Sequence, residues 1–440
     1  MTDGVNSREL VLEMLLEINE NGSYSHLVLR DVLSKYQYLQ KQDRAFITRL
    51  TEGTIERLIE LDYIIDQFSK TKVRKMKPLI RNLLRMSVYQ IMYMDKVPDA
   101  ATCNEAVKIA KRHKFQQLSG FVNGVLRNIS RNKNTIKYPD EQSNPGRYLE
   151  IKYSMPAWIV DKWTCDYGYE KTREILEGVQ KENKLSIRTN KSACTPEELK
   201  ERLISEGVTV ESVNTKTPID EYAFYISDYD YLEALDSFND GLFYVQDISS
   251  MLVAQIADVK KDDYVIDVCA APGGKSTHIA ELLGNTGMVD ARDLTEYKVG
   301  LIEDNIARTG LTNIKAKVWD ATVLDEQSVG KADVLICDLP CSGLGVLGKK
   351  TDIRYKITEQ SLTSLSELQH KILDTVYTYV KDTGILVYST CTINKIENEK
   401  TAEWFTTKYP QFKLVSMKQM YPKETGNDGF FIAKFQNTGV

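Results

Sequence analysis

From about residue 240 onward, segments typical of strands alternate with segments typical of helices. YVIDVC (264–269) leads through a glycine-rich loop into a helical pattern at 276–283, and the strand-like segments MVDARD, IKAKVW and ADVLICD follow. A further helical pattern from Leu365 to Tyr379 precedes GILVYST. Because strands joined through helices pair in parallel, this region is predicted to form a doubly wound α/β sheet. Ligands of such sheets bind beyond the carboxyl ends of the strands.

The final segments depart from this alternation. After a short helical pattern around Ala402, the strand-like segments FKLVS and FFIAKF follow one another with no helix between them. They predict an antiparallel hairpin at the end of the sheet, which is the variant typical of class I, Rossmann-like methyltransferases. We therefore expect residues 239–440 to form a catalytic domain of that class.

Two smaller regions precede this domain. Residues 1–140 carry apolar side chains at helical spacing, which predicts an all-α domain. The stretch 134–147 has the polar, proline- and glycine-bearing composition of a linker. Within 147–238, LSIRTN, VTVESV and YAFYIS look like strands, and TPEELKERLISEG looks like a capped helix. This order predicts a small α+β module of ferredoxin-like or RRM-like type.

The net charge of −5 conceals an uneven distribution. Residues 1–145 contain 23 Lys and Arg against 17 Asp and Glu, whereas residues 146–440 contain 34 against 45. Residues 106–139 hold eight basic side chains and no acid. Solvated helix faces explain such runs as readily as RNA contacts do, but phosphates require a basic footprint. The candidate RNA-binding residues are Lys108, Lys111, Arg112, Lys114, Arg127 and Arg131.

Several classes of protein are disfavoured. The N-terminal residues MTDGVNSREL resemble neither a secretory signal nor a transit peptide, and no run of about 18 apolar residues predicts a membrane span. We therefore expect a cytoplasmic location and no membrane partner. The seven cysteines are scattered and form no C-x-x-C pair, and only four histidines are present. Neither a disulfide framework nor a metal site is predicted.

The glycine-rich loop and three acids predict a cofactor site. VIDVCAAPGGKST ends like a phosphate-binding loop but has Cys269 where the first glycine of that motif would stand. Asp293, Asp320 and Asp338 each follow a predicted strand. One such acid alone is typical of a turn or helix cap. Three at one sheet edge fit a nucleoside cofactor such as S-adenosyl-L-methionine, with Asp293 at the ribose, Asp320 at the adenine amino group and the loop against the methionine portion.

Two cysteines are predicted at the same edge. Cys341 lies in DLPCSGLG and Cys391 in YSTCTINKIENE, each just beyond a strand. A buried cysteine is usually a small apolar filler, but loops of Pro, Ser, Gly and Thr favour reactive thiols. A thiolate that adds to carbon 6 of cytosine makes carbon 5 nucleophilic enough to take a sulfonium methyl group. Asp338 is placed to protonate or hydrogen-bond cytosine N3, and the target base must leave any stack.

Longer stretches of the sequence resemble a known family. DVCAAPGGKSTHIAELL, DLPCSGLGVLGKKTDIRY, YSTCTINKIENE and the terminal DGFFIAKF resemble the NOL1/NOP2/Sun class of RNA 5-methylcytosine methyltransferases. The N-terminal third, with DRAFITRLTEGT and GFVNGVLRNI, is similar to the RNA-binding fold of the antitermination factor NusB. The combination resembles the RsmB (Sun/Fmu) family, which methylates a cytosine of 16S ribosomal RNA.

The resemblance implies roles for individual residues. Cys391 would be the nucleophile and Cys341 would assist release of the methylated product, although spacing alone leaves these roles open because DNA 5-methylcytosine enzymes use the PC cysteine. Leu339 and Lys395–Ile396 depart from the family pattern and put loop detail in doubt. The implied cofactor contacts are Cys269, Ala270, Ala271, Pro272, Gly273, Gly274, Lys275, Asp293, Asp320 and Asp338. The implied cofactor is S-adenosyl-L-methionine, and the implied partner of a monomeric chain is 16S ribosomal RNA, naked or in an early small-subunit particle.

Three alternatives stay open at this point. A DNA methyltransferase would use Cys341, a related enzyme would modify another ribosomal RNA or a tRNA, and a non-catalytic NusB-like factor would only bind RNA. The second cysteine at Cys391 and the basic helical region disfavour the first alternative, and the presence of both thiols and the loop disfavours the last. A purely structural interpretation, in which the two cysteines fill space and the three acids cap turns or helices, would require five coincidences at one sheet edge.

Overall fold

The computed structural model describes residues 5–181, 184–422 and 428–439. They form two compact units. The first comprises Met1–Gln180 with Lys349–Lys356, and the second comprises Lys181–Gly348 with Ile357–Val440. Among the described residues, no helix is both long and apolar enough to cross a bilayer.

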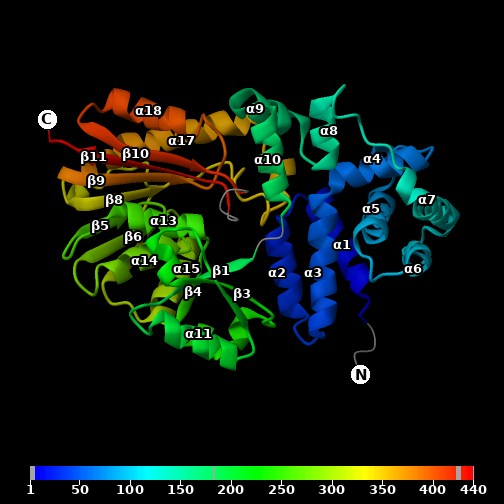
Figure 1. Cartoon of the computed structure of the whole chain (residues 1–440), viewed down its shortest axis with the longest axis horizontal. Helices are drawn as coiled ribbons and strands as arrows, with labels where there is room; N and C mark the ends of the chain where they lie inside the picture. Colours follow the sequence, from blue (N-terminus) through cyan, green and yellow to red (C-terminus); the bar gives the residue numbers. More distant parts are fainter. Residues whose placement is uncertain (1–4, 182–183, 423–427, 440) are drawn as a thin grey trace. The chain divides into compact units, whose positions relative to one another are not determined.

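The first unit is built of helices (Figure 1). Asn6 caps the first helix by accepting the backbone N–H groups of Arg8 and Glu9, and buried apolar side chains recur at helical spacing along this helix. The all-α fold predicted for the N-terminal region is confirmed. The helices are α1 (Ser7–Glu20), α2 (Ser25–Lys35), α3 (Lys41–Glu56), α4 (Leu58–Phe68), α5 (Pro78–Tyr93), α6 (Asp99–Arg112), α7 (Ser119–Asn132), α8 (Pro145–Lys152), α9 (Ala157–Tyr167), α10 (Tyr169–Val179) and α16 (Ile353–Lys356), with the 3₁₀ turns η1 (Val73–Lys75), η2 (Gln116–Leu118) and η3 (Lys133–Thr135).

Helices α8 to α10 were not predicted from the sequence. They fall within the region assigned above to the α+β module, yet they belong to the helical unit. Their signal was present, because Ile175, Leu176 and Val179 bury one face of α10. The boundaries 1–140, 147–238 and 239–440 stay a prediction.

The segment 349–356 returns to the helical unit from far along the chain. Asp352 accepts hydrogen bonds from the backbone N–H of Ser25 at 2.9 Å and from its hydroxyl at 2.6 Å. Lys356 pairs with Asp352 at 2.7 Å and donates to the carbonyl of Ser23 at 2.6 Å. These contacts, together with the fully buried Arg354, anchor the segment in the helical unit.

The second unit begins with a small antiparallel sheet in the strand order β2-β3-β1-β4. Thr195 and Glu198 form a capping box at the start of its helix, α11. The predicted α+β module is confirmed, and the structure adds a strand, β4, and a following helix that the sequence did not predict. The elements are β1 (Leu185–Thr189), α11 (Pro196–Ser205), β2 (Thr209–Ser212), η4 (Pro218–Glu221), β3 (Ala223–Ser227), η5 (Leu232–Ala234), α12 (Asp236–Asn239), β4 (Phe243–Val245) and α13 (Ile248–Ala257).

The rest of this unit is a seven-stranded sheet in the order β10-β11-β9-β8-β5-β6-β7. Strands β5 to β9 pair in parallel, and β11 and β10 close the sheet with antiparallel pairing. The predicted doubly wound sheet with a terminal hairpin is thereby confirmed. Its elements are β5 (Tyr264–Asp267), α14 (Gly274–Leu282), β6 (Met288–Asp293), α15 (Glu296–Thr309), β7 (Ile314–Val318), η6 (Glu326–Ser328), β8 (Ala332–Asp338), α17 (Glu359–Val376), η7 (Tyr377–Tyr379), β9 (Val380–Thr390), α18 (Glu399–Lys408), β10 (Phe412–Met420) and β11 (Phe430–Asn437).

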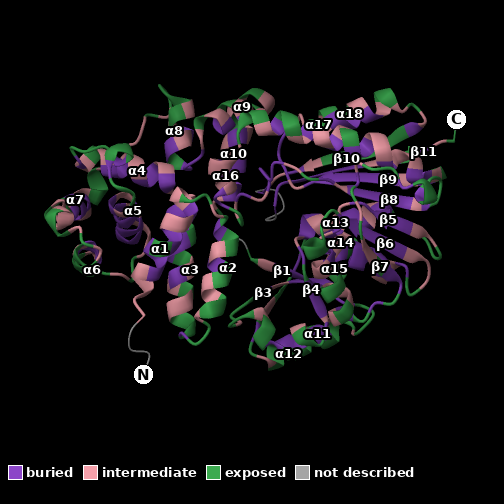
Figure 2. Ribbon diagram, turned by 180° about the vertical axis from the view of Figure 1, so that it is seen from behind, coloured by how far each residue is buried: buried purple, intermediate pink, exposed green. Residues whose placement is uncertain are grey.

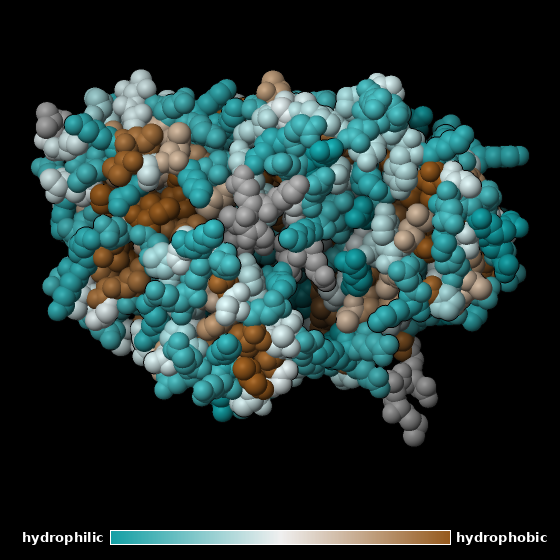
Figure 3. Space-filling view, in the orientation of Figure 1, coloured by the Kyte–Doolittle hydropathy of each residue, from teal (hydrophilic) through white to brown (hydrophobic). Residues whose placement is uncertain are grey.

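Helices cover both faces of the large sheet, and its strands are buried (Figure 2). One core joins α13, α14 and α15 to one face, and a second joins α17 and α18 to the other. The two edge strands are less buried, since Val318 of β7 and Leu414, Val415 and Met417 of β10 are exposed. In Figure 3, hydrophobic surface gathers on the side of the molecule where this sheet lies.

A buried ion pair attaches the small sheet to the large one. Arg188 of β1 binds Glu281 of α14, and both side chains are almost fully buried. Arg188 also donates to Gln246 at 2.8 Å and lies over the ring of Tyr244 at 4.1 Å. Beside this pair, the hydroxyl of Tyr222 lies 3.2 Å from the imidazole of His278. The module is therefore held on α14, the helix that begins at the glycine-rich loop.

Candidate active site

The carboxyl ends of β5, β6 and β8 meet at one edge of the large sheet. Strand order reverses between β5 and β8. Strands β6 and β7 lie on one side of β5, whereas β8 and β9 lie on its other side. This reversal is the switch point at which doubly wound sheets bind ligands. Asp267 ends β5, Asp293 ends β6 and Asp338 ends β8.

The glycine-rich loop leaves β5 at this edge and is tied to β6. Ala270 donates its backbone N–H to the carbonyl of Arg292 at 2.8 Å, and Ala271 donates to the Asp293 carboxylate at 3.0 Å. Gly273 has a φ of +104°, and a Cβ there would meet Ile302 at 3.3 Å. The loop therefore requires glycine at this point and presents its backbone at the sheet edge.

The acids predicted to bind the cofactor occupy different environments. Asp293 is 3% exposed, and its carboxylate accepts from the backbone of Ala271 and Leu294 and pairs with Lys298 at 3.0 Å. Asp320 lies exposed beyond β7, where one oxygen accepts from the backbone and hydroxyl of Thr322, each at 2.8 Å. Asp293 is thus joined to the glycine-rich loop, whereas no contact joins the described atoms of Asp320 to the other predicted site residues.

Asp267 provides an observation that fits a cationic ligand. It is fully buried, one carboxylate oxygen accepts from the Ser276 hydroxyl at 2.6 Å, and the other has no hydrogen-bond partner in the described part of the chain. Burial raises the pKa of Asp267 to about 7. An unpaired buried oxygen beside a small-residue loop suits the ammonium group of S-adenosyl-L-methionine, so the residues present fit this cofactor.

Lys275 and Asp338 form an ion pair between the loop and β8. Lys275 Nζ lies 2.6 Å from one Asp338 oxygen, and Ser389 donates its hydroxyl to the other at 2.7 Å. The lysine also lies over the ring of Phe430 at 5.4 Å. Burial alone would lower the pKa of Lys275, but the negative charge of Asp338 and its hydrogen bond to the lysine outweigh burial and raise that pKa. Lys275 therefore stays a cation at this edge.

The two predicted cysteines lie side by side. Cys341 Sγ is 3.3 Å from Cys391 Sγ, and all seven cysteines of the chain, each within the described residues, are free. The hydrogen bond with Cys391 and burial raise the pKa of the Cys341 thiol well above its usual range. Cys341 is accordingly protonated at neutral pH and can act as a proton donor toward its neighbour.

The candidate RNA-binding residues lie on α6, α7 and the turn after α6, in the helical unit. All six are exposed. Lys108 pairs with Glu105 at 2.7 Å and Arg112 with Glu9 at 2.9 Å. Such surface pairs are weak enough for phosphates to compete with them.

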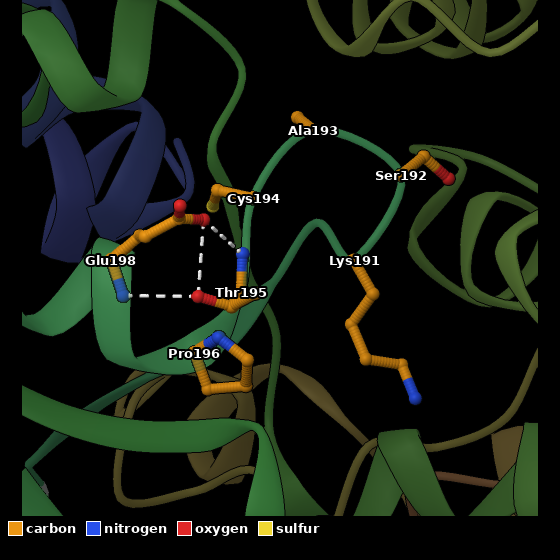
Figure 4. Close-up of a pocket in the computed structure, with 7 residues that line it drawn as sticks. All are labelled: Lys191, Ser192, Ala193, Cys194, Thr195, Pro196 and Glu198. Carbon is orange, nitrogen blue, oxygen red and sulfur yellow. Dashed lines mark hydrogen bonds between the residues drawn. The ribbon is translucent and has the colours of Figure 1, made fainter.

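A pocket lies away from the predicted residues, in the small module (Figure 4). It surrounds the start of α11 and includes Lys191, Cys194 and Pro196. Glu198 accepts from the backbone of Thr195 at 2.8 Å and from its hydroxyl at 3.0 Å, so these groups bond each other. Burial raises the pKa of Cys194 to about 11. We assign no role to this pocket. Among the described residues, no cluster of His, Cys, Asp or Glu side chains could hold a metal ion.

Sequence reasoning missed part of the site. It assigned Lys275 only to the cofactor loop and did not predict its pairing with Asp338, because the two residues are 63 positions apart. It also passed over Asp267, although an acid at the end of the strand before the loop was a usable signal. Glu397 and Ser389, which hydrogen-bond Ser342 and Asp338, both lie in the YSTCTINKIENE stretch, but nothing in that stretch indicated these contacts.

Comparison with known proteins matches all three parts of the chain. A sequence profile described as 16S rRNA methyltransferase RsmB/F matches residues 254–436, the NusB family matches 5–131, and the RsmF/B-like ferredoxin-like domain matches 155–217. A Bacillus subtilis protein named "Probable ribosomal RNA small subunit methyltransferase B" is 36% identical over 98% of this chain and 99% of its own length.

Solved structures share the fold. The crystal structure of PH0851 superposes with a TM-score of 0.81 at 25% identity, covering 98% of this chain and 99% of that one. The structure of NSun6 from Pyrococcus horikoshii with SFG matches with a TM-score of 0.57 at 23% identity, over 63% of this chain and 97% of that one.

Fold, site and comparisons together define an S-adenosyl-L-methionine-dependent ribosomal RNA methyltransferase with a NusB-like RNA-binding domain. The helical, ferredoxin-like and Rossmann-like parts predicted from the sequence are all confirmed. The chain belongs to the ribosomal RNA small subunit methyltransferase B family.

Proposed function

We propose that this protein methylates carbon 5 of one cytosine in 16S ribosomal RNA through a covalent intermediate on Cys391. The observation that carries the proposal is the pair of thiols 3.3 Å apart, next to the Lys275–Asp338 ion pair at the cofactor edge of the sheet. A single nucleophile would need only one cysteine. Two in contact suit a reaction that must both form and break a carbon–sulfur bond.

The reaction begins with the Cys391 thiolate. Its electron pair forms a bond to carbon 6 of cytosine, the electrons of the 5,6 double bond form a double bond between carbons 4 and 5, and the electrons of the 3,4 double bond take a proton at N3. The cofactor, when bound, would supply an electrophilic methyl group to the activated carbon 5, and its sulfur would keep the electron pair of the broken methyl–sulfur bond. Carbon 5 then gives its proton to solvent, the carbon 6–sulfur bond breaks so that the thiolate leaves with the electron pair, and N3 gives its proton back as the aromatic ring is restored.

Lys275 and Asp338 support the first step. The lysine ammonium is the cation of this site, and its charge acts strongly where water is largely excluded. Asp338 was expected to protonate or hydrogen-bond N3. Since both its oxygens already accept hydrogen bonds, from Lys275 and Ser389, we propose that it acts at N3 together with the lysine, which holds the transferable proton.

Cys341 acts in the last step. Its raised pKa keeps the thiol protonated, so Cys341 can hydrogen-bond the sulfur of Cys391 and stabilise it as it leaves carbon 6. The loop 269–275, Asp293 and Asp320 hold the cofactor in this proposal. The basic residues of α6 and α7 bind the RNA backbone, and the enzyme acts as a monomer in the cytoplasm on naked RNA or an early small-subunit particle.

Methyl transfer from radiolabelled S-adenosyl-L-methionine to unmethylated small-subunit RNA tests the proposal. We expect Cys391→Ala to abolish transfer and Cys341→Ser to accumulate a protein–RNA adduct that survives denaturing electrophoresis. Cys165→Ser, which changes an exposed cysteine on α9, is the matched control and should transfer normally. Full activity of Cys391→Ala would contradict the assignment of the nucleophile.

A further inference from the structure

One buried carboxylate joins the loops that carry the two cysteines. Glu397 is fully buried and follows Cys391 by six positions. One of its oxygens accepts from the backbone N–H of Ser342 at 2.8 Å, and the other accepts from the Ser342 hydroxyl at 2.5 Å. Ser342 is the residue directly after Cys341.

The same carboxylate is bonded to the loop of Cys391. Asn394 donates its side-chain amide to Glu397 at 2.6 Å. The Ser342 hydroxyl also lies 2.7 Å from the hydroxyl of Thr392, the residue directly after Cys391. Each cysteine is therefore followed immediately by a residue of one hydrogen-bonded network.

Further bonds reinforce this connection. Thr392 accepts the backbone N–H of Leu344 at 3.2 Å, and the backbone of Gly345 donates to the carbonyl of Cys391 at 3.1 Å. Gln369 of α17 donates to the carbonyl of Pro340 at 2.9 Å and to Glu397 at 3.4 Å. The backbones of the two loops are thus joined on both sides of the thiols.

The network requires a carboxylate at its centre. The groups that hydrogen-bond the Glu397 carboxylate within the described residues are donors from Ser342, Asn394 and Gln369, and no Lys or Arg is among them. An amide in its place would put an N–H₂ group against donors whichever way it turned. Burial raises the pKa of Glu397, and the hydrogen bonds from Ser342 and Asn394 oppose that rise.

We propose that Glu397 is a positioning residue that holds the Cys341 thiol against Cys391 for product release. It touches neither substrate nor cofactor in this role and acts through Ser342 and Thr392. The inference rests on the proposed covalent mechanism, because a thiol that assists release matters only where an adduct forms. Misplacing a reacting group by about an ångström can lower a rate roughly 100-fold.

The test measures turnover and adduct in the full-length enzyme with small-subunit RNA and radiolabelled cofactor. We expect Glu397→Gln to lower kcat roughly 10- to 100-fold while the KM for S-adenosyl-L-methionine stays within about twofold. We also expect it to accumulate the protein–RNA adduct, as Cys341→Ser does. A residue that served stability alone would lower the amount of active enzyme and of adduct together.

Two further variants sharpen the measurement. Glu403→Gln, on the exposed face of α18, makes the same chemical change outside the network and should match the wild type. The double variant Cys341→Ser with Glu397→Gln should hold no more adduct than Cys341→Ser alone, because residues that act in one step are not additive. If Glu397→Gln does not fold, Ser342→Ala replaces it as the test. This variant removes the bridging hydroxyl but keeps the hydrogen bond from the backbone N–H of residue 342 to Glu397. It should lower kcat several-fold and increase the amount of adduct.

The outcomes separate this inference from the proposed function. Activity in Cys391→Ala, or no adduct in Cys341→Ser, would contradict the covalent mechanism itself. Suppose instead that those two variants behave as expected. The positioning role is then wrong if Glu397→Gln folds and has the same kcat and amount of adduct as Glu403→Gln. Ser342→Ala replaces Glu397→Gln in this comparison if the latter does not fold.

Discussion

Replacing Asp267 with asparagine should remove a pH-dependent destabilisation of the protein without its cofactor. The Asp267 carboxyl is fully buried, and burial raises its pKa from 3.8 to about 7. Between these two values the folded state binds the proton more tightly than the unfolded state does. The free energy of unfolding therefore falls as pH rises through this window, by about 1.4 kcal/mol per pH unit and about 4 kcal/mol in total.

Most of this loss falls in an accessible range. Between pH 5 and pH 8 the contribution of Asp267 amounts to roughly 2–3 kcal/mol. The variant Asp267→Asn keeps an acceptor for the Ser276 hydroxyl but carries no titrating proton at this position. We therefore expect the free energy of unfolding of Asp267→Asn, relative to that of the wild type, to rise by that amount between pH 5 and pH 8.

Urea unfolding followed by tryptophan fluorescence measures this difference at pH 5, 6, 7 and 8. Comparing variant with wild type at each pH cancels the other titrating groups. A difference that stays constant within about 0.5 kcal/mol from pH 5 to pH 8 would refute the reasoning that Asp267 is protonated in the folded enzyme. Ser276→Ala, which removes the donor to Asp267, should raise the pKa of Asp267 further and steepen the loss of stability above pH 7.

Three further predictions concern other parts of the molecule. Arg188→Ala should lower the free energy of unfolding by about 3–5 kcal/mol because it leaves Glu281 buried without its partner. The double variant Arg188→Met with Glu281→Leu should lower the free energy of unfolding by less. Equal losses in the two variants, measured by urea unfolding, would contradict this prediction. Diamide, a two-electron thiol oxidant, should join Cys341 and Cys391 in a disulfide and stop methyl transfer until dithiothreitol reduces it; peptide mass spectrometry that finds no link between these cysteines would contradict the contact. Changing Lys108, Lys111, Arg112 and Lys114 together to Gln should weaken RNA binding and make the negative slope of log affinity against log salt shallower by up to about 3. An unchanged slope would assign the cluster to ordinary solvated surface.

The sequence predicted the large sheet well because its elements have strong local signals. The strands that end at Asp267 and Asp338 are short apolar runs, and parallel pairing places the ends of neighbouring strands at one edge. The sequence also placed both cysteines at that edge. It could not predict that their sulfurs are in contact, because this depends on how two loops 50 positions apart fold onto each other.

Long-range polar contacts account for most of what was missed. Lys275 with Asp338, Arg188 with Glu281, and Ser25 with Asp352 each join residues far apart in the chain. No periodicity encodes such pairs, since each requires only one polar or charged residue at each end. Segment 349–356 is the clearest case, because nothing in its sequence indicates that it packs in the helical unit.

The identity of the cysteine that bonds to RNA tests the central claim most directly. The Cys341→Ser variant would be incubated with small-subunit RNA and S-adenosyl-L-methionine, digested with nuclease and protease, and its peptides sequenced by mass spectrometry. The proposed mechanism predicts a methylated cytosine nucleotide attached to the peptide that contains Cys391. Turnover by Cys341→Ser with no adduct, or an adduct formed instead by Cys391→Ser on Cys341, would contradict it.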